Sequence, residues 1–107
     1  MVYFVGAGTG AVDLITVRGM HLLEKADVII YAGSLVNPEL LQYAKKDCEI
    51  HNSARLTLPE VLAIMEEAEK DGKVIVRLHT GDPSIYGAVR EQMDALDADD
   101  IAYDDTP

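Results

Sequence analysis

Residues 74–87 read VIVRLHTGDPSIYG, and the change of pattern within this stretch indicates an α/β fold. The apolar residues 74–76 are typical of a strand that is buried on both faces of a parallel sheet. A polar turn follows, in which Asp82 is a good N-cap for a helix and Pro83 suits the first helical position. Capping alone explains this turn. The turn also follows the carboxyl end of a strand, where open parallel sheets bind ligands, so a binding site is the second interpretation.

Strand-like and helix-like segments alternate along the rest of the chain. Short apolar runs predict strands at residues 2–5, 27–31, 48–51, 73–78 and 101–105. Apolar residues at helical spacing predict helices from about residue 16, over 38–46, after 57 and over 84–96. This alternation predicts an α/β fold, with a mostly parallel sheet of about five strands and helices on both faces.

The signals for a helix are clearest around residues 57–72. Thr57 and Glu60 have the spacing of a capping box, and Gly72 follows the last turn as a C-terminal glycine. A buried stripe at helical spacing is formed by Leu58, Val61, Leu62 and Met65. This stripe is typical of a helix that packs on a core.

Length and composition indicate one soluble domain. The chain has 107 residues, of which 49% are hydrophobic, and a chain of this size buries roughly two thirds of its unfolded surface. Cys48 is the only cysteine, which excludes an internal disulfide and fits a reducing compartment. No apolar run approaches the roughly 20 residues of a membrane span, and the first residues lack a signal-peptide core. We therefore expect a cytoplasmic protein that does not enter a membrane.

The chain is acidic, with 19 Asp and Glu residues against 9 Lys and Arg and a net charge of −10. Nucleic acids and anionic lipids require a basic surface, so neither is an expected partner. From Glu91 onward the sequence holds seven acidic residues and no Lys or Arg. A solvated acidic surface is the simpler interpretation. The alternative is adaptation to high salt, where counterions screen the self-repulsion of the folded chain.

Residues 6–11, GAGTGA, follow the first predicted strand and match the glycine pattern of dinucleotide-binding proteins. In those proteins the loop turns directly into a helix that meets the pyrophosphate, and an acidic residue after the second strand binds the ribose. Here residues 11–13 continue the loop, and the second strand ends at Tyr31 without such an acid. An NAD-binding domain stays open as one alternative, and a non-catalytic interaction domain as another.

Three segments carry a family resemblance, and they read VGAGTGAVDLITVRG (5–19), ADVIIYAGSLVNPELL (26–41) and VRLHTGDPSIYGAVREQ (76–92). In this order they resemble the tetrapyrrole methylase family, and within it the members that methylate carbon 11 of precorrin-4 or cobalt-precorrin-4 in cobalamin biosynthesis. The resemblance implies a methyltransferase with S-adenosylmethionine as cofactor, a tetrapyrrole as substrate and a homodimeric full-length protein. Other precorrin methyltransferases and uroporphyrinogen-III methyltransferases are the alternative within the family.

The family's proteins have two α/β domains, with the cofactor in the cleft between them. We therefore expect residues 1–107 to be the N-terminal domain, and the second domain to be missing from this chain. Because half of the cleft would then be absent, we expect the chain to be inactive alone.

The resemblance also implies site residues. It places S-adenosylmethionine, mainly through backbone groups, against Thr9, Thr80, Gly81, Asp82 and Ile85. It implies that the loop with Gly8 and Gly10 faces the tetrapyrrole. The family's loop usually reads GAGPGDPDL, and this chain departs from it at positions 9, 11 and 12. Ala32 stands where the uroporphyrinogen-methylating relatives carry an aspartate for proton transfer, which favours the precorrin-4 type.

A precorrin carries many carboxylates, so an acidic protein needs local basic or polar groups to bind it. His51, Asn52 and Arg55 lie at and just after the end of the third predicted strand, and Arg90 lies in the last predicted helix. These four are candidates for the substrate site, although each such residue is more often an ordinary surface residue. The three histidines lack metal-ligand spacing, so we expect no protein-bound metal, and any cobalt would belong to the substrate.

Overall fold

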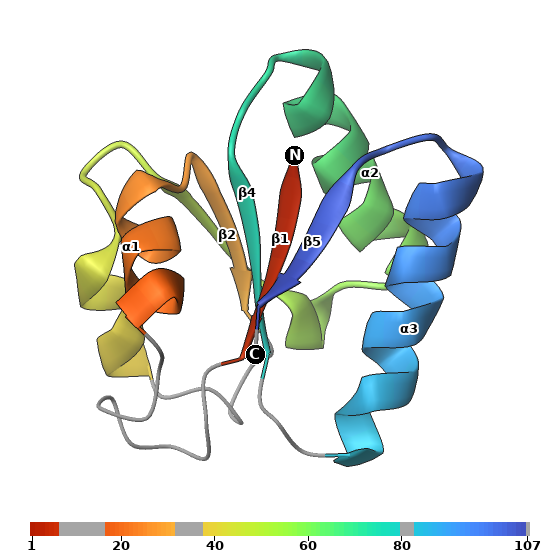
Figure 1. The fold of residues 1–107 in the computed structure, drawn as a ribbon, viewed down its shortest axis with the longest axis horizontal. Coiled ribbons are helices and arrows are strands. Elements are labelled where there is room, and N and C mark those ends of the chain that lie inside the picture. The colour runs from red at the N-terminus through yellow and green to blue at the C-terminus, as the bar shows by residue number, and fades with distance from the viewer. Residues whose placement is uncertain (7–16, 32–37, 80–82, 107) are drawn as a thin grey trace.

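Five strands form a parallel sheet in the computed structural model, which describes residues 1–6, 17–31, 38–79 and 83–106. The strands are β1 (Val2–Gly6), β2 (Val28–Tyr31), β3 (Glu49–Asn52), β4 (Ile75–His79) and β5 (Tyr103–Thr106). Their order is β3-β2-β4-β1-β5, and every pairing is parallel. The strands run toward the lower edge of the sheet in Figure 1. The predicted α/β fold and its five strands are therefore confirmed.

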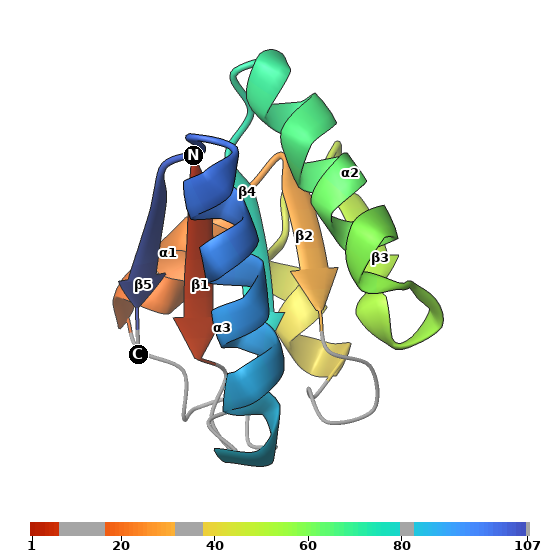
Figure 2. The same ribbon diagram turned by 90° about the vertical axis from the view of Figure 1, so that its right-hand side faces the viewer.

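Helices cover both faces of the sheet (Figures 1 and 2). One face carries α1 (Val17–Lys25) and the short 3₁₀ helix η3 (Pro38–Tyr43). The other carries α2 (Leu58–Lys70) and α3 (Pro83–Ala98), and a single 3₁₀ turn, η4 (Ser53–Arg55), joins β3 to α2. This arrangement confirms the prediction of helices on both faces.

The predicted helix over residues 38–46 differs from the structure in type and length. It is a 3₁₀ helix that ends at Tyr43, and the N–H of Ala44 donates to the carbonyl of Leu41 at 3.1 Å. Tighter i→i+3 bonds of this kind are common in short connectors. Leu40 is buried, so the short helix still anchors one apolar side chain in the core.

The sheet separates two hydrophobic cores. Toward α2 and α3, the sheet presents Val2, Phe4, Val28, Ile30 and Ile75, which pack with helix residues such as Met65 and Leu96. Toward α1 and η3, it presents Val5, Ile29, Val76 and Leu78, which pack with Leu23 and Leu40. This division follows from the two-residue period of a strand. Because both faces of the central strands are covered, their sequences are continuous apolar runs.

β4 lies between β1 and β2, although it is the fourth strand in the chain. In the register of the sheet, Arg77 pairs with Phe4 of β1 on one side and with Ile30 of β2 on the other. Dinucleotide-binding sheets instead place the first strand beside the second, in the order 3-2-1-4-5. The strand order therefore gives no support to the NAD-binding alternative that the glycine pattern had raised.

Both predicted ends of α2 are confirmed. The Thr57 hydroxyl accepts the N–H of Glu60 at 3.3 Å, and the Glu60 carboxylate accepts the N–H of Thr57 at 3.1 Å. The hydrogen bond from the Thr57 N–H, followed by one from the Thr57 hydroxyl, lowers the pKa of the Glu60 carboxylate. At the other end, Gly72 has a φ of 68°, and the N–H of Lys73 donates to the carbonyl of Ala68 at 3.1 Å. This is a Schellman-type C-cap.

The end of α3 repeats this motif without a glycine. Asp100 takes the left-handed conformation with a φ of 56°. Its N–H donates to the carbonyl of Asp97 at 3.2 Å, and the N–H of Ile101 donates to the carbonyl of Leu96 at 2.9 Å. At its other end α3 begins at Pro83, as predicted.

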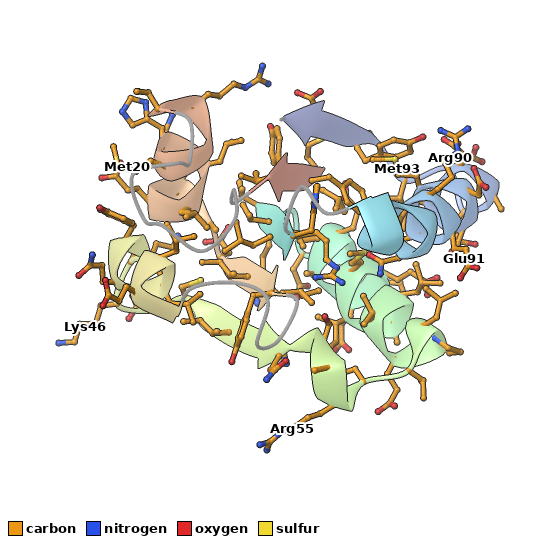
Figure 3. The ribbon with its side chains drawn as sticks, turned by 90° about the horizontal axis from the view of Figure 1, so that it is seen from below. Met20, Lys46, Arg55, Arg90, Glu91 and Met93 are labelled. Carbon is orange, nitrogen blue, oxygen red and sulfur yellow. The ribbon has the colours of Figure 1, made fainter. Side chains whose placement is uncertain are left out.

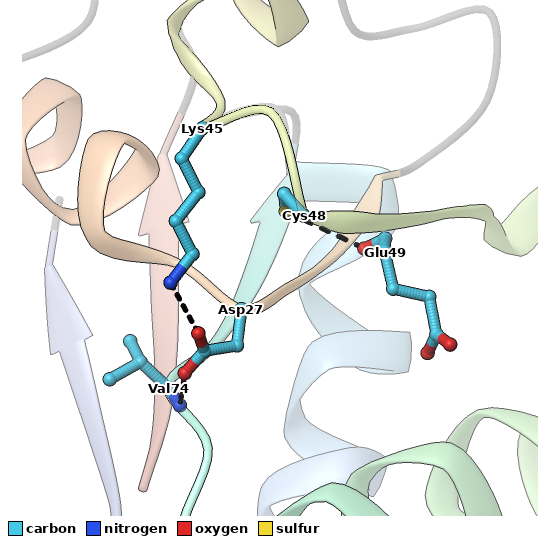
Figure 4. Close-up of polar contacts among 5 residues, drawn as sticks. All are labelled: Asp27, Lys45, Cys48, Glu49 and Val74. Carbon is cyan, nitrogen blue, oxygen red and sulfur yellow. Dashed lines mark hydrogen bonds and ion pairs between the residues drawn. The ribbon is translucent and has the colours of Figure 1, made fainter.

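Asp27 connects three strands at the amino edge of the sheet (Figure 4). Its carboxylate accepts the N–H of Val74 at 2.9 Å and forms an ion pair with Lys45, and its carbonyl accepts the N–H of Glu49 at 2.9 Å. The Lys45 contact, followed by the Val74 hydrogen bond, holds the pKa of Asp27 below its usual value. Asp27 therefore ties the starts of β2, β3 and β4 together.

Some acidic residues of the last segment pair with bases. Arg18 Nη2 lies 2.5 Å from Asp104 Oδ2, and Arg90 Nε lies 3.4 Å from Asp94 Oδ1. All four side chains are exposed, so these pairs contribute little to stability. Among the residues that the structure describes, no helix is long and apolar enough to cross a membrane.

Candidate functional site

The carboxyl edge of the sheet brings together the starting points of the three predicted binding segments. β2, β4 and β1 are neighbours, and their ends are aligned, because Tyr31 pairs with Leu78 and Gly6 pairs with His79. Segments 7–16, 32–37 and 80–82 follow these three strands directly in the chain. Ligands in open parallel sheets bind at this edge, where connections leave in opposite directions. Here the connection after β2 runs through η3 on one face, and the connection after β4 runs through α3 on the other.

Most of the predicted cofactor and loop residues lie outside the described residues. These are Gly8, Thr9, Gly10, Ala32, Thr80, Gly81 and Asp82. Ile85 lies in the first turn of α3, within the described backbone, but its side chain is not described. The roles of these residues stay predictions, as does the N-cap role of Asp82.

His51, Asn52 and Arg55, predicted for the substrate, lie together on β3 and η4. Asn52 caps η4, because its side-chain oxygen accepts the N–H of Ala54 at 2.9 Å. His51 Nε2 lies 2.9 Å from Glu49 Oε2. Its ring borders a cavity of about 300 Å³ beside α2, whose other lining residues are Glu49, Ile64, Glu67, Ala68, Asp71 and Lys73. Asn52 and His51 thus already have partners within the domain.

Arg55 and Arg90 are both exposed, and Arg90 lies about halfway along α3. Figure 3, which views the molecule from the carboxyl edge of the sheet, shows the two side chains projecting from different sides. Arg55 ends η4, whereas Arg90 lies on α3 beside Asp94. The structure therefore does not gather the four predicted substrate residues at one point, and their roles stay predictions.

A buried arginine at this edge was not among the predicted site residues. Arg77 on β4 is 4% exposed. Its Nε donates to Gln92 Oε1 at 3.0 Å, and its Nη1 donates to the carbonyls of Ile30 and Leu78, each at 3.3 Å. Burial lowers the pKa of Arg77 to about 10, so the guanidinium remains charged at neutral pH. The sequence held one signal for it, a charged residue inside the apolar run VIVRL.

Ser53 adds a second side-chain contact at the same edge. Its hydroxyl donates to the carbonyl of Tyr31, the last residue of β2, at 3.0 Å. Arg77 holds the preceding carbonyl, that of Ile30. The last two carbonyls of β2 are therefore both bound by side chains.

The described residues contain no group of three or more His, Cys, Asp or Glu side chains placed to hold a metal ion. His51 and Glu49, the close pair on β3, are therefore not accompanied by further ligands within that part of the chain. Nothing in the described geometry adds a metal to the site.

The family model of the Tetrapyrrole (Corrin/Porphyrin) Methylases matches residues 1–107, the whole of this chain. The chain belongs to the tetrapyrrole methylases. This tetrapyrrole methylase is 59% identical, over 95 residues, to the cobalt-precorrin-4 C(11)-methyltransferase of Methanocaldococcus jannaschii, a match covering 89% of this chain and 37% of that protein. It is 46% identical, over 106 residues, to the precorrin-4 C(11)-methyltransferase of Rhodococcus erythropolis, covering 99% of this chain and 43% of that protein.

Solved structures give the same family. A cobalt precorrin-4 methyltransferase matches 99% of this tetrapyrrole methylase with a TM-score of 0.92 and 42% identity. A uroporphyrin-III C-methyltransferase from Thermus thermophilus, in complex with S-adenosylhomocysteine, matches 99% of the chain with a TM-score of 0.79 and 28% identity. The chain covers 44% and 43% of these two proteins. It thus spans less than half the length of the relatives that it matches.

Proposed function

We propose that the protein containing this chain transfers a methyl group from S-adenosylmethionine to carbon 11 of precorrin-4 or cobalt-precorrin-4. One structural observation carries the proposal: segments 7–16, 32–37 and 80–82, which lie within the three stretches that resemble the family, directly follow the aligned carboxyl ends of β1, β2 and β4. The names of the relatives from M. jannaschii and R. erythropolis support this choice of substrate.

The carboxyl edge fits a ligand such as S-adenosylmethionine. Three strand ends meet there with the beginning of α3, a helix of 16 residues. Strand ends and a helix N-terminus offer backbone carbonyl and N–H groups, which suit the amino, carboxylate, ribose and adenine groups of this cofactor. Thr9, Thr80, Gly81, Asp82 and Ile85 are the residues proposed to hold it. When bound, the cofactor would supply a methyl group on a positively charged sulfur.

Transfer of that methyl group to a ring carbon is an in-line displacement. The protein therefore has to hold two molecules in line and exclude water, and it needs no nucleophilic side chain of its own. In this proposal the sheet provides a rigid edge, and the segments after β1, β2 and β4 contact the ligands. Gly8 and Gly10 would face the tetrapyrrole, and Arg55 and His51 would contribute to binding its carboxylates.

Methylation of uroporphyrinogen III is the second candidate function. The uroporphyrinogen-III C-methyltransferase of Bacillus subtilis is 41% identical to this chain over 113 residues. The residue after β2 argues against this activity, because Ala32 replaces the aspartate that such enzymes use. An aspartate-dependent proton transfer would therefore lack its group here.

To test the proposal, the full-length protein is incubated with methyl-labelled S-adenosylmethionine and one of three substrates, which are precorrin-4, cobalt-precorrin-4 and uroporphyrinogen III. We expect one labelled methyl group on carbon 11 of a precorrin-4 substrate, identified by mass spectrometry and NMR, together with S-adenosylhomocysteine. Comparison of the two precorrin-4 substrates then shows whether cobalt is required. Methylation of uroporphyrinogen III alone would replace the first proposal with the second.

The proposal includes the domain arrangement, a homodimer and a cytoplasmic location. We propose that residues 1–107 supply one of two domains that enclose the cofactor, in line with their coverage of 37–44% of the relatives described above. Isolated residues 1–107 should then bind S-adenosylhomocysteine far more weakly than the full-length protein in calorimetric titrations. Equal affinity would contradict the two-domain site.

Light scattering of the full-length protein tests the proposed homodimer.

A further inference from the structure

We propose that Arg77 is a positioning residue for the cofactor site, because it holds the carboxyl ends of β2 and β4 at a fixed separation. This inference rests on the proposed function, since it assigns the cofactor to that edge of the sheet. It concerns a residue of the strand, not one of the residues proposed to contact the cofactor.

The two hydrogen bonds of Nη1 span neighbouring strands. They end on the carbonyls of Ile30 and Leu78, each the second-last residue of its strand. The next residue of β2 is Tyr31, whose carbonyl accepts a hydrogen bond from the Ser53 hydroxyl. Segment 32–37 follows Tyr31 directly, and segment 80–82 begins two residues after Leu78. A shift of either strand end would therefore alter the starting point of a segment that carries the family's motif.

Gln92 fixes the guanidinium from the opposite side. Its Oε1 accepts from Arg77 Nε at 3.0 Å, and both side chains are only 4% exposed. Gln92 belongs to α3, which begins directly after segment 80–82. Arg77 thus connects the strand before this segment to the helix after it, in addition to connecting β4 to β2.

Hydrophobic packing alone does not account for an arginine at this position. The acceptors of these three hydrogen bonds are all neutral, and no ion pair joins Arg77 to a carboxylate in the described part of the chain. Burying a charge in this way is unfavourable, and an apolar side chain of similar volume is often at least as stable. A cavity of about 200 Å³ also borders Arg77, so the side chain is not closely packed on that side. The other lining residues are Ser53, Leu56, Leu58, Val61, Glu91 and Gln92.

The test compares four variants of the full-length protein with the wild type. Arg77→Met removes all three hydrogen bonds, Arg77→Lys keeps a positive donor without the planar fork, and Gln92→Glu keeps an acceptor for Nε. Met65→Ala is the control. Met65 is fully buried in the hydrophobic core between the sheet and α2, and its side chain donates no hydrogen bond to the strand ends. For each protein we would measure the Tm and, at a temperature where it is folded, the Kd for S-adenosylhomocysteine by calorimetry.

We expect Arg77→Met to raise the Kd about tenfold or more, because small displacements of binding groups have large effects. Arg77→Lys should bind more weakly than the wild type but better than Arg77→Met, and Gln92→Glu should bind like the wild type. Met65→Ala should lower the Tm without changing the Kd. If Arg77→Met does not fold, a raised Kd for Arg77→Lys beside an unchanged Kd for Met65→Ala supports the inference.

Wild-type affinity in a folded Arg77→Met, or in Arg77→Lys where only that variant folds, would overturn the inference while leaving the proposed function intact. An equal rise in Kd for Met65→Ala would also overturn it, since the effect would then follow from general destabilisation. A wild-type protein that does not bind S-adenosylhomocysteine would overturn both the inference and the proposed function.

Discussion

Two charged side chains, Asp27 and Arg77, hold main-chain groups at opposite edges of the parallel sheet. At the amino edge the Asp27 carboxylate accepts the N–H of Val74. At the carboxyl edge the Arg77 guanidinium donates to the carbonyls of Ile30 and Leu78. Buried or partly buried backbone groups require such partners. The negative side chain therefore satisfies a backbone donor at one edge, and the positive side chain satisfies two backbone acceptors at the other.

The ion pair of Asp27 should make stability depend on pH. Asp27→Asn keeps an oxygen for the N–H of Val74 but loses the pair with Lys45, so we expect a lower Tm at pH 7. Because the folded state lowers the pKa of Asp27 below its usual 3.8, the wild type has this advantage above that pH and loses it as the pH falls further. Thermal melts of both proteins between pH 7 and pH 2.5 test this. A Tm difference that is the same at every pH would contradict it.

Asp82 carries two predictions, an N-cap and a place in the cofactor site. In the full-length protein, Asp82→Ala should weaken S-adenosylhomocysteine binding by more than the loss of a cap, about 1 kcal/mol, explains. Asp82→Asn is the matched control, because asparagine caps helices as well as aspartate does. It should retain more of the affinity. Unchanged affinity for Asp82→Ala in calorimetric titrations would leave only the cap.

At the scale of the elements, α2 and α3 end in the same hydrogen-bonding motif with different residues. α2 has Gly72 in the left-handed position, and α3 has Asp100. A Cβ added to Gly72 would meet no atom within 4 Å, so a substitution there would act through the backbone conformation alone. The two positions thus form a natural pair of opposite tests.

We expect Gly72→Ala to destabilise the fold by about 1 kcal/mol, because a left-handed conformation is unfavourable for an L-residue. Asp100→Gly should stabilise it by up to about 1 kcal/mol for the same reason, less the greater chain entropy of glycine in the unfolded state. Urea unfolding of the two variants and the wild type measures both changes. Two changes of the same sign would contradict the explanation from backbone conformation.

Local sequence patterns predicted the strands, the capping box, Gly72 and the start of α3, because each depends on neighbours within a few residues. The position of β4 between β1 and β2 depends on pairings between distant segments, which no local pattern contains. Arg77 illustrates the same limit at the site. Its charge within an apolar run was visible, but its acceptors come from β2 and α3. Likewise, the 3₁₀ form of η3 and the C-cap at Asp100 depend on details of backbone geometry that residue types alone leave open.

At the scale of the whole molecule, the net charge of −10 opposes folding through self-repulsion. Repulsion between like charges acts directly between the carboxylates of Glu66 on α2 and Asp99 after α3, because these two groups lie together. The hydrogen bond with Asp99 raises the pKa of Glu66. The pair is therefore most favourable when it shares a proton, and its contribution is lost as the pH rises through the raised pKa.

Salt should stabilise this protein if repulsion between its acidic side chains is the main electrostatic term that opposes folding. We expect the Tm at pH 7 to rise as KCl increases toward molar concentration, since counterions screen like charges. Asp99→Asn should raise the Tm in low salt and reduce the response to KCl, because it removes the repulsion between the Asp99 and Glu66 carboxylates. The absence of any gain in Tm toward molar KCl would exclude the adaptation to high salt raised by the sequence.

The place of β4 in the sheet also determines when the domain can fold during its synthesis. In the described sheet β1 does not pair with β2; Val2 pairs instead with Ile75 of β4 and with Tyr103 of β5. Within this domain, β1 is synthesised before the other strands of the sheet and can pair only once β4 and β5 have been made. Pairings between such distant segments form slowly and leave strand edges open in the meantime. A pause in translation before residue 75 should accordingly leave the nascent chain open to aggregation or to chaperone binding, whereas a pause after β5 has emerged should not.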